Sequence, residues 1–463
     1  MKNKKGFTLI ELLAIIVILA IIAVITVPII LNIIDNASKG ASVDSANGYK
    51  DALQKYYATK SISNSEFELP TGYYEVSELP SDFTVSGELP SDGWVKLKKG
   101  VVERYSLKYK DYVVTMDNDK NVTTEKQNYT APYVTNDYQE VEYLESTGTQ
   151  YIDTQLTTQQ GIGFDVTFLT NASISASGYG CILGGRKASG DNDFQITTYR
   201  SKSNYNGTIR NGEGYSGTEY NAMITLNEKQ HISLINNTIT YNDGTTQNTN
   251  DYTWSENNNI YLFGLNQNGG FSQSGPGSRI YNAKLLVGDN IVRNYVPVIR
   301  KSDNKPGMVD LANRTNNLFN PYTVVKGRQD DGIVGYQSGT SQLNVSDGTI
   351  YCTTTTTWRG FTSDYIEVSS RNYFISVPSQ SGMSVSCSQY DINKQFIKKG
   401  TLNTTLEENC KYIRFTFTFQ TAGEYQVNNI MLNEGTQALS YEPYGYKFYT
   451  NSGGGEFIAG PEL

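Results

Sequence analysis

The chain has 463 residues, which is room for about three domains of roughly 150 residues each. Its formal net charge of -8 and its pI near 5.0 exclude binding to a nucleic-acid backbone as the main activity, because phosphate affinity requires clustered Lys and Arg. The 35 Tyr and 42 Gly, together with frequent Asn, Thr and Ser, favour a surface-exposed β-rich protein over a cytosolic enzyme.

The first predicted element is a membrane-spanning helix near the N-terminus. Residues 12–31 contain no charged side chain, and at 1.5 Å per residue they cover a bilayer core of about 30 Å. Three lysines precede this stretch, so we expect the N-terminus to start on the cytoplasmic side. Glu11 stands directly before the uncharged run, which is an unusual position for a carboxylate in a plain membrane anchor.

The stretch "KKGFTLIELL" resembles the prepilin signal of type IV pilins and pseudopilins, over about the first thirty residues. The resemblance implies that a prepilin peptidase cuts between Gly6 and Phe7 on the cytoplasmic side, and that the new amine of Phe7 is methylated. It also implies that Glu11 matches the glutamate of the family motif, and that Pro28 matches the proline inside the family's helix.

Glu11 has a physical role under this interpretation. A lone carboxylate within a membrane costs about 2.5–3.5 kcal/mol on insertion scales, and pairing with a cation lowers that cost. Cleavage creates such a cation, the α-amino group of Phe7, and the resemblance implies pairing with the terminus of a neighbouring subunit. A buried pair of this kind would set the subunit register in a filament. The alternative is an isolated acid in an ordinary anchor.

The helix is predicted to continue past the membrane, over about residues 8–58. Ala46, Tyr49, Leu53 and Tyr56 recur at helical spacing and form one apolar face, suited to pack on a sheet. Pro28 removes one backbone hydrogen bond and should kink or locally open this helix.

A small antiparallel sheet is expected over about residues 62–125, completing a pilin domain at 7–130 after the leader 1–6. The tripeptide "ELP" occurs three times at a spacing of ten residues, which is typical of a strand meander. The alternating sequence "GWVKLKKGVVERYSLKYKDYVVTM" then indicates half-buried strands. The polar stretch 131–137 is predicted to be a linker.

Short strand patterns separated by Gly, Asn and Ser turns fill the next part of the chain. "VEYLESTGTQYIDT" and "PVIRKSDNKPGMVDL" resemble concanavalin-like (laminin G-like) jelly-roll domains. The final "YKFYTNSGGGEFIAG" is too short to fold alone and reads as a hairpin that joins the same sheet. We therefore assign 138–315 plus 446–463 to one jelly roll that an insertion interrupts, since insertions are tolerated where the chain ends lie close.

The inserted segment 316–445 has a strand pattern of its own. In "YIRFTFTF" the side chains of Ile413, Phe415, Phe417 and Phe419 should face one way and the intervening polar ones the other. "NLFNP" and "IMLNEGTQALSYEPYG" resemble β-sandwich modules of the carbohydrate-binding type. The predicted fold class is therefore α+β: a long N-terminal α-helix packed on a small antiparallel sheet, followed by two all-β sandwich, jelly-roll-like modules.

The sequence contains no pattern for catalysis or for a cofactor, and we predict no enzyme activity. Asp191 and Asp193 could ligate calcium, but they also suit an ordinary turn, and calcium usually requires six or more oxygens. The single histidine, His231, is expected to be satisfied or solvent-facing. Cys352, Cys387 and Cys410 could hold one disulfide outside the cell, or could be buried free thiols. With Cys181 they show no CxxC spacing, which argues against zinc.

Aromatic residues in polar surroundings are the weak candidates for ligand contact. Trp254 lies in "NDYTWSENNN" near Tyr252, and Trp358 lies in "TTTTTWRGF". Each could stack on a sugar ring, and each could equally be a core or strand-end residue. Loops rich in Tyr and Asn suit adaptable contacts with glycan or protein.

We expect a minor or tip subunit of a type IV pilus, anchored in the membrane as a precursor and later exposed at the cell surface. Its expected partners are the prepilin peptidase, other pilin subunits through the N-terminal helix, and a glycan or surface protein through the distal modules. The alternative is a pseudopilin of a secretion or DNA-uptake apparatus. A wall-glycan hydrolase on a pilin anchor is a third possibility, disfavoured because no acid pair is evident.

Overall fold

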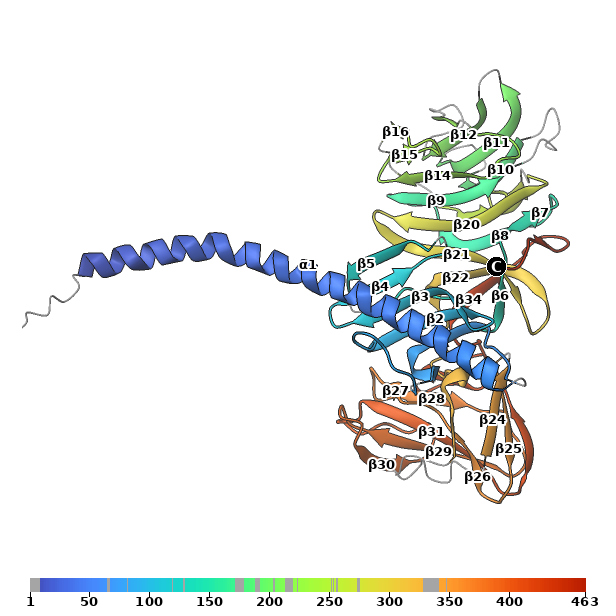
Figure 1. Ribbon diagram of the computed structural model, residues 1–463. Coiled ribbons are helices and arrows are strands. Elements are labelled where there is room, and N and C mark those ends of the chain that lie inside the picture. Colours follow the sequence, from blue (N-terminus) through green and yellow to red (C-terminus); the bar gives the residue numbers. More distant parts are fainter. Residues whose placement is uncertain are drawn as a thin grey trace, which may run out of the picture. The chain divides into compact units, whose positions relative to one another are not determined.

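The computed structural model describes residues 9–463 except 65–66, 81, 119, 128–129, 171–178, 188–191, 203–204, 213–219, 223, 251, 253, 255–256, 273–274, 328–340 and 347. Within helix α1 the side chains of residues 9–12, 14–15 and 19–25 are also outside this description. The chain divides into two compact units, residues 1–133 and residues 134–463. Figure 1 labels their helices and strands.

The first unit begins with one long helix, α1 (Leu9–Ser63), which runs through Pro28 without interruption (Figure 1). The helix ends five residues beyond the predicted end at residue 58. The helix continues through Pro28, so the local opening is not seen; the kink that a missing backbone hydrogen bond would cause there stays a prediction. At 1.5 Å per residue, α1 is about 80 Å long.

A meander of antiparallel strands follows α1 in the first unit. In the described residues the strand order equals the chain order, β1-β2-β3-β4-β5. The strands are β1 (Gly72–Glu75), β2 (Asp92–Lys98), β3 (Val101–Tyr109), β4 (Tyr112–Met116) and β5 (Val122–Lys126), and a short 3-10 helix, η1 (Val76–Glu78), follows β1. The expected long helix followed by a small antiparallel sheet is confirmed.

The second half of α1 packs on this sheet through one face. Ala46, Tyr49 and Leu53 are buried with Tyr57 against strand residues such as Val95, Leu97, Tyr105 and Leu107. Tyr57 is buried on the helix face to which the sequence assigned Tyr56, whereas Tyr56 is only partly buried. The spacing of four residues after Leu53 keeps the tyrosine on the same helical face.

The second unit contains a sandwich of two β-sheets. Its larger sheet has the order β16-β15-β14-β9-β20-β21-β22-β34, with β6 on β21, β7 on β20 and β35 on β7. These strands are β6 (Tyr138–Glu140), β7 (Leu144–Ser146), β9 (Ile162–Leu169), β14 (Gln230–Ile235), β15 (Thr238–Thr240), β16 (Thr246–Asn248), β20 (Ser278–Val287), β21 (Asn290–Arg300), β22 (Lys305–Arg314), β34 (Tyr446–Thr450) and β35 (Ile458–Ala459).

The smaller sheet has the order β13-β12-β11-β10-β17-β8, with β18 on β10 and β19 on β18. Its strands are β8 (Ile152–Thr157), β10 (Tyr179–Arg186), β11 (Phe194–Lys202), β12 (Tyr205–Asn211), β13 (Tyr220–Ala222), β17 (Asn259–Leu262), β18 (Leu265–Gln267) and β19 (Gly270–Ser272). One apolar core takes side chains from both sheets, including Phe164 and Phe168 from one and Phe194 and Ile196 from the other. This shared core makes the pair a sandwich.

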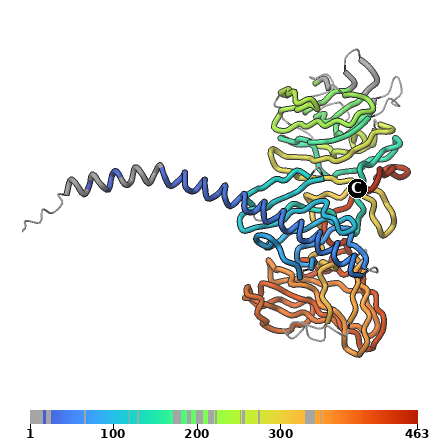
Figure 2. Tube along the Cα trace, viewed as in Figure 1, coloured from blue at the N-terminus to red at the C-terminus, as the bar shows by residue number. Residues whose placement is uncertain are grey.

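Segment 316–445, called the 316–445 module below, leaves the larger sheet after β22 and returns to it at β34. β34 pairs antiparallel with β22, for example Val309 opposite Phe448, and Figure 2 shows the trace come back in red after the orange module. The two ends of the module lie side by side, because the Thr315 N–H donates to the Gly445 carbonyl at 2.9 Å. This geometry is what an insertion at a loop requires.

The 316–445 module has a core and sheets of its own. The larger of its sheets has the order β23-β26-β31-β29-β30, with β27 on β31; β24-β25-β32 and β28-β33 form two smaller sheets. The strands are β23 (Val325–Lys326), β24 (Ser341–Ser346), β25 (Thr349–Thr354), β26 (Arg359–Thr362), β27 (Ile366–Glu367), β28 (Tyr373–Ser376), β29 (Met383–Tyr390), β30 (Phe396–Gly400), β31 (Tyr412–Phe419), β32 (Gly423–Val427) and β33 (Met431–Glu434), with a 3-10 helix, η2 (Pro321–Thr323). Ile413, Phe415, Phe417 and Phe419 of β31 all enter the core, as their alternation predicts.

Candidate functional site

The N-terminal segment is the first candidate site, and part of it can be described. Gly6 and Phe7 lie outside the described residues. The backbone of Glu11 belongs to α1, but its side chain is not among those described. From Thr26 to Ile34 the side chains are described, and the apolar ones are exposed. Val27, Ile29, Ile30, Leu31, Ile33 and Ile34 are each at least half exposed. Such a continuous apolar surface on a helix calls for a partner.

The predicted membrane span, residues 12–31, falls partly outside the described side chains. Among the described residues, no helix is both long enough and apolar enough to cross a membrane.

Comparison with known protein families identifies a motif in this segment. Residues 1–27 match the prokaryotic N-terminal methylation motif. The match supports a type IV pilin or pseudopilin, which is a structural subunit whose precursor is anchored in the membrane. The match covers the predicted leader, the predicted cleavage position and the first part of α1, so Gly6, Phe7 and Glu11 all lie inside it. No curated protein and no solved structure matches the chain.

The tryptophan and tyrosine candidates differ in their surroundings. Trp254 packs partly buried against the sandwich core, edge-on to Phe194 at a centroid distance of 6.4 Å and to Tyr252 at 6.1 Å. Trp358 is 46% exposed and has a positive φ of 56° at the start of β26. The two tryptophans therefore belong to separate places in the fold, and Trp358 is the more exposed of the two.

Of the two possible calcium ligands, the structure describes only Asp193. Asp191 lies outside the described residues, whereas Asp193 is fully buried beside Arg210, whose guanidinium is 3.5 Å away. Gln195 donates to the same carboxylate at 3.1 Å. A cation is therefore already supplied by the protein at Asp193. Among the described residues no group of three or more potential metal ligands gathers.

The single histidine lies at the surface, and the four cysteines lie mostly in the interior. His231 lies on the surface with its Nε2 3.2 Å from a carboxylate oxygen of Asp165. The four cysteines are free thiols; Cys181, Cys352 and Cys387 are buried and Cys410 is partly buried. Burial raises the pKa of Cys352 and of Cys387 to about 12, so neither thiol has the low pKa of a reactive nucleophile.

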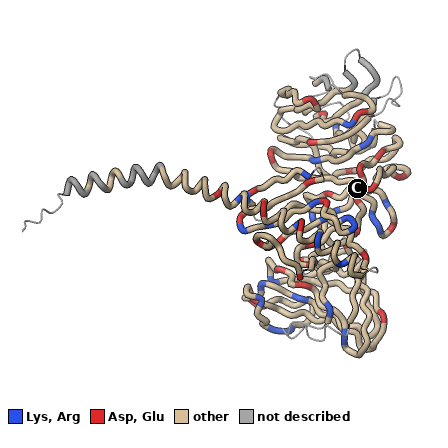
Figure 3. Tube along the Cα trace, viewed as in Figure 1, with Lys and Arg blue, Asp and Glu red and all other residues tan. Residues whose placement is uncertain are grey.

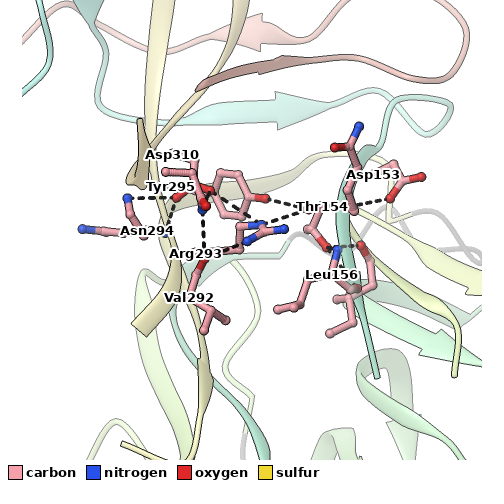
Figure 4. A network of polar contacts seen from close by, with 12 residues as sticks. Asp153, Thr154, Leu156, Val292, Arg293, Asn294, Tyr295 and Asp310 are labelled. Atoms are coloured by element: carbon pink, nitrogen blue, oxygen red, sulfur yellow. Dashed lines mark hydrogen bonds and ion pairs between the residues drawn. The ribbon is translucent and has the colours of Figure 1, made fainter. Parts of the chain in front are cut away.

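A buried polar network joins the two sheets of the second unit (Figure 4). Asp310 accepts hydrogen bonds from the Asn294 N–H at 2.7 Å and the Ala312 N–H at 3.1 Å, and also from the Asn313 amide. The Arg293 guanidinium lies 3.6 Å from Asp310 and donates to the Thr154 carbonyl at 3.0 Å. These contacts use the carboxylate and the guanidinium inside the protein, so the network holds strands β8, β21 and β22 together.

A small cleft lies at the start of the 316–445 module. It is lined by residues that include Asp137, Asn317, Gly348 and Tyr441 and has room for about one water molecule. The Tyr322 hydroxyl donates to Asp137, and the Gly348 N–H donates to that same hydroxyl at 3.1 Å. These two hydrogen bonds connect the 316–445 module to Asp137 within the second unit.

The sequence analysis missed one cluster that the fold assembles. Tyr365, Lys394, Tyr412 and Arg414 come from three separate stretches of the 316–445 module and are connected by ring contacts; Phe396 lies two residues after Lys394. Their separation along the chain hides them from any motif. The density of Lys and Tyr between residues 390 and 414 was the signal available.

Proposed function

We propose that this chain is a minor or tip subunit of a type IV pilus, cleaved between Gly6 and Phe7, which displays β modules for adhesion to a glycan or a surface protein. The methylation motif at residues 1–27 carries the proposal. The exposed apolar side chains of residues 27–34 support it, because burial against neighbouring helices is worth about 1.5–3 kcal/mol for each fully covered Ile, Leu or Val.

The size of the second unit supports a minor or tip position. It spans residues 134–463, against 1–133 for the unit that holds the helix and the small sheet. A repeating subunit with so large an addition would crowd its neighbours along a filament. A few copies, or one copy at the tip, avoid that steric conflict and place the β modules where they can reach a surface.

We also propose the domain identities that the sequence resembled. Residues 138–315 with 446–463 would be a concanavalin-like jelly roll, and 316–445 an inserted sandwich of the carbohydrate-binding type. The two-sheet sandwich and the pairing of β34 with β22 support this division. The polar stretch 131–137 is less free than a linker, since Trp94 Nε1 donates to the Ala131 carbonyl at 2.6 Å and Tyr133 stacks on Tyr73.

A pseudopilin of a secretion or DNA-uptake apparatus is the second candidate function, because the matched motif is shared by pilins and pseudopilins. In that case the chain would stay with the cell envelope, and its deletion would impair secretion or transformation. Recovery of the chain in filaments that are sheared from cells favours the pilus instead.

Replacing Glu11 by Val tests the role in assembly. An unpaired buried charge costs about 3–5 kcal/mol, so losing Glu11 as the partner of the Phe7 amine should lower the chain in sheared filaments about tenfold or more. The amount in the membrane fraction should stay unchanged. Asp51→Val is the matched control, because Asp51 is an exposed acid on the same helix. Equal filament incorporation of Glu11→Val and Asp51→Val would contradict the assembly role.

A further inference from the structure

The β29–β30 hairpin of the 316–445 module presents apolar and cationic side chains to solvent. Ile392 is 63% exposed and Phe396 is 41% exposed. The Asp391 carboxylate fixes the turn, accepting the N–H groups of Asn393 and Gln395 at 2.9 Å each. Lys394 has a φ of 57° in this turn, a region that Gly or Asn adopts more easily. The turn therefore holds the Lys394 backbone in a conformation that is unfavourable for a lysine.

Strand register brings these residues into two rows on one face of the sheet. Tyr412 of β31 lies opposite Tyr390 of β29, which lies opposite Phe396 of β30. In the next row Arg414 lies opposite Ser388, which lies opposite Lys399. Residues directly opposite each other point to the same face of a sheet. An aromatic row thus lies next to a row that begins and ends with a cation.

Two cations share one tyrosine ring beside these rows. The Lys394 ammonium is 4.7 Å from the ring centroid of Tyr365 and 5.5 Å from that of Tyr412. The Arg414 guanidinium is 4.5 Å from the Tyr365 centroid, and its Nε donates to the Ser363 carbonyl at 2.8 Å. Arg414 is buried and holds the ring, whereas Lys394 is exposed. We call Tyr365, Lys394, Phe396, Lys399, Tyr412 and Arg414 the cationic aromatic patch.

The carboxylates around the patch are already engaged. Glu407 pairs with Lys398, and Glu367 pairs with Lys411 at 2.9 Å. Asp364 accepts the Tyr365 N–H at 2.7 Å. Within the described part of the chain, no carboxylate lies at ion-pair distance from Lys394. Lys394, Lys398 and Lys399 lie close together along the β29–β30 hairpin of a protein whose net charge is -8, and Figure 3 shows Lys and Arg around β30 in blue.

We propose that the cationic aromatic patch binds an acidic polysaccharide whose pyranose rings carry carboxylates. Exposed aromatic and aliphatic side chains match the apolar C–H faces of sugar rings, and the cations match carboxylates through charge-assisted hydrogen bonds. A polymer of charged polyols without rings would leave Phe396 and Tyr412 without a flat partner. The inference rests on the proposed display role, since it names the ligand class of one displayed module.

Binding of polygalacturonate to the full-length chain in detergent micelles tests this inference. We expect saturable binding that weakens as salt is added, because exposed charge pairs are screened. Fully methyl-esterified polygalacturonate has the same rings without the charges, and we expect it to bind about tenfold more weakly. Polyglutamate has the charge without sugar rings, and it should also bind more weakly. Equal affinity for the esterified polymer or for polyglutamate would overturn the proposal.

Variants locate the binding on the patch. Lys394→Gln combined with Lys399→Gln should lower the affinity for polygalacturonate about tenfold, and Lys394→Arg should keep most of it. Lys110→Gln is the matched control, because Lys110 is also an exposed turn lysine with a positive φ, 48°, and it lies in the first unit. An unchanged thermal midpoint excludes unfolding as the cause. If the double variant binds like the natural chain, the patch is not the site.

Absence of binding to all three polymers would also overturn this inference, and it would leave the pilin proposal intact. Processing at Gly6 and filament entry are measured at the other end of the chain and do not depend on the patch. Loss of processing at Gly6 with intact glycan binding would contradict the pilin proposal and leave the binding inference intact. The two proposals therefore fail separately.

Discussion

The Asp310 carboxylate is completely buried in the second unit and is satisfied by backbone and side-chain donors together with Arg293. Asp310→Ala leaves Arg293 without its carboxylate, so we expect a loss of about 3–5 kcal/mol in the unfolding free energy of this unit. Asp303→Ala breaks an exposed pair with Arg300 and should cost about 0–1 kcal/mol. Urea unfolding of both variants measures the difference, and equal midpoints would contradict a structural role for the network.

Cysteine reactivity at single residues gives a prediction that depends on pH. Desolvation raises the pKa of Cys387 to about 12 and also raises the pKa of Cys410, which is less buried. Thiols with a raised pKa stay protonated near neutral pH and react slowly. We expect iodoacetamide at pH 8 to label Cys410 before Cys387 in the folded chain, with faster labelling as the pH rises. Mass spectrometry reads the order; resistance of both to labelling after unfolding, relieved only by a reductant, would indicate a disulfide instead.

At the scale of single elements, α1 is held on the small sheet by one buried face. Leu53 is fully buried in that core, whereas Ile62 on the last turn is 87% exposed. Leu53→Ala should therefore destabilise the first unit by about 2–5 kcal/mol, and Ile62→Ala should change its stability by less than about 0.5 kcal/mol. Hydrogen exchange of the β3 amides reports this unit alone. Similar protection in both variants would mean that the helix does not depend on this face.

The "ELP" repeat shows where reasoning about elements fails. The sequence spacing predicted a regular meander, yet of the two intervals between the repeats only 71–77 contains a strand, β1, in the described residues. Each Pro lacks the N–H that a sheet ladder requires, and the segment between residues 81 and 90 connects β1 to β2 without strand pairing in its described part. Equal spacing marked the breaks and not the strands.

At the scale of the whole molecule, the sequence was sufficient for the long helix, the small sheet and the β-rich remainder, because 3.6-residue and two-residue periodicities report burial directly. The N-terminal motif was also readable, since its residues are contiguous. The cationic aromatic patch was not, because Tyr365, Lys394 and Arg414 meet only through the register of β29 and β31. Trp254 was equally uncertain, since a polar neighbourhood in sequence does not reveal packing against a core.

We propose that the Glu11 carboxylate pairs with an amine that only cleavage before Phe7 exposes. Intact mass and N-terminal peptide analysis of the chain, isolated from cells with an active prepilin peptidase, tests it most directly. We expect a mature chain that starts at Phe7 with a methylated amine. A mature chain that still starts at Met1 would contradict it.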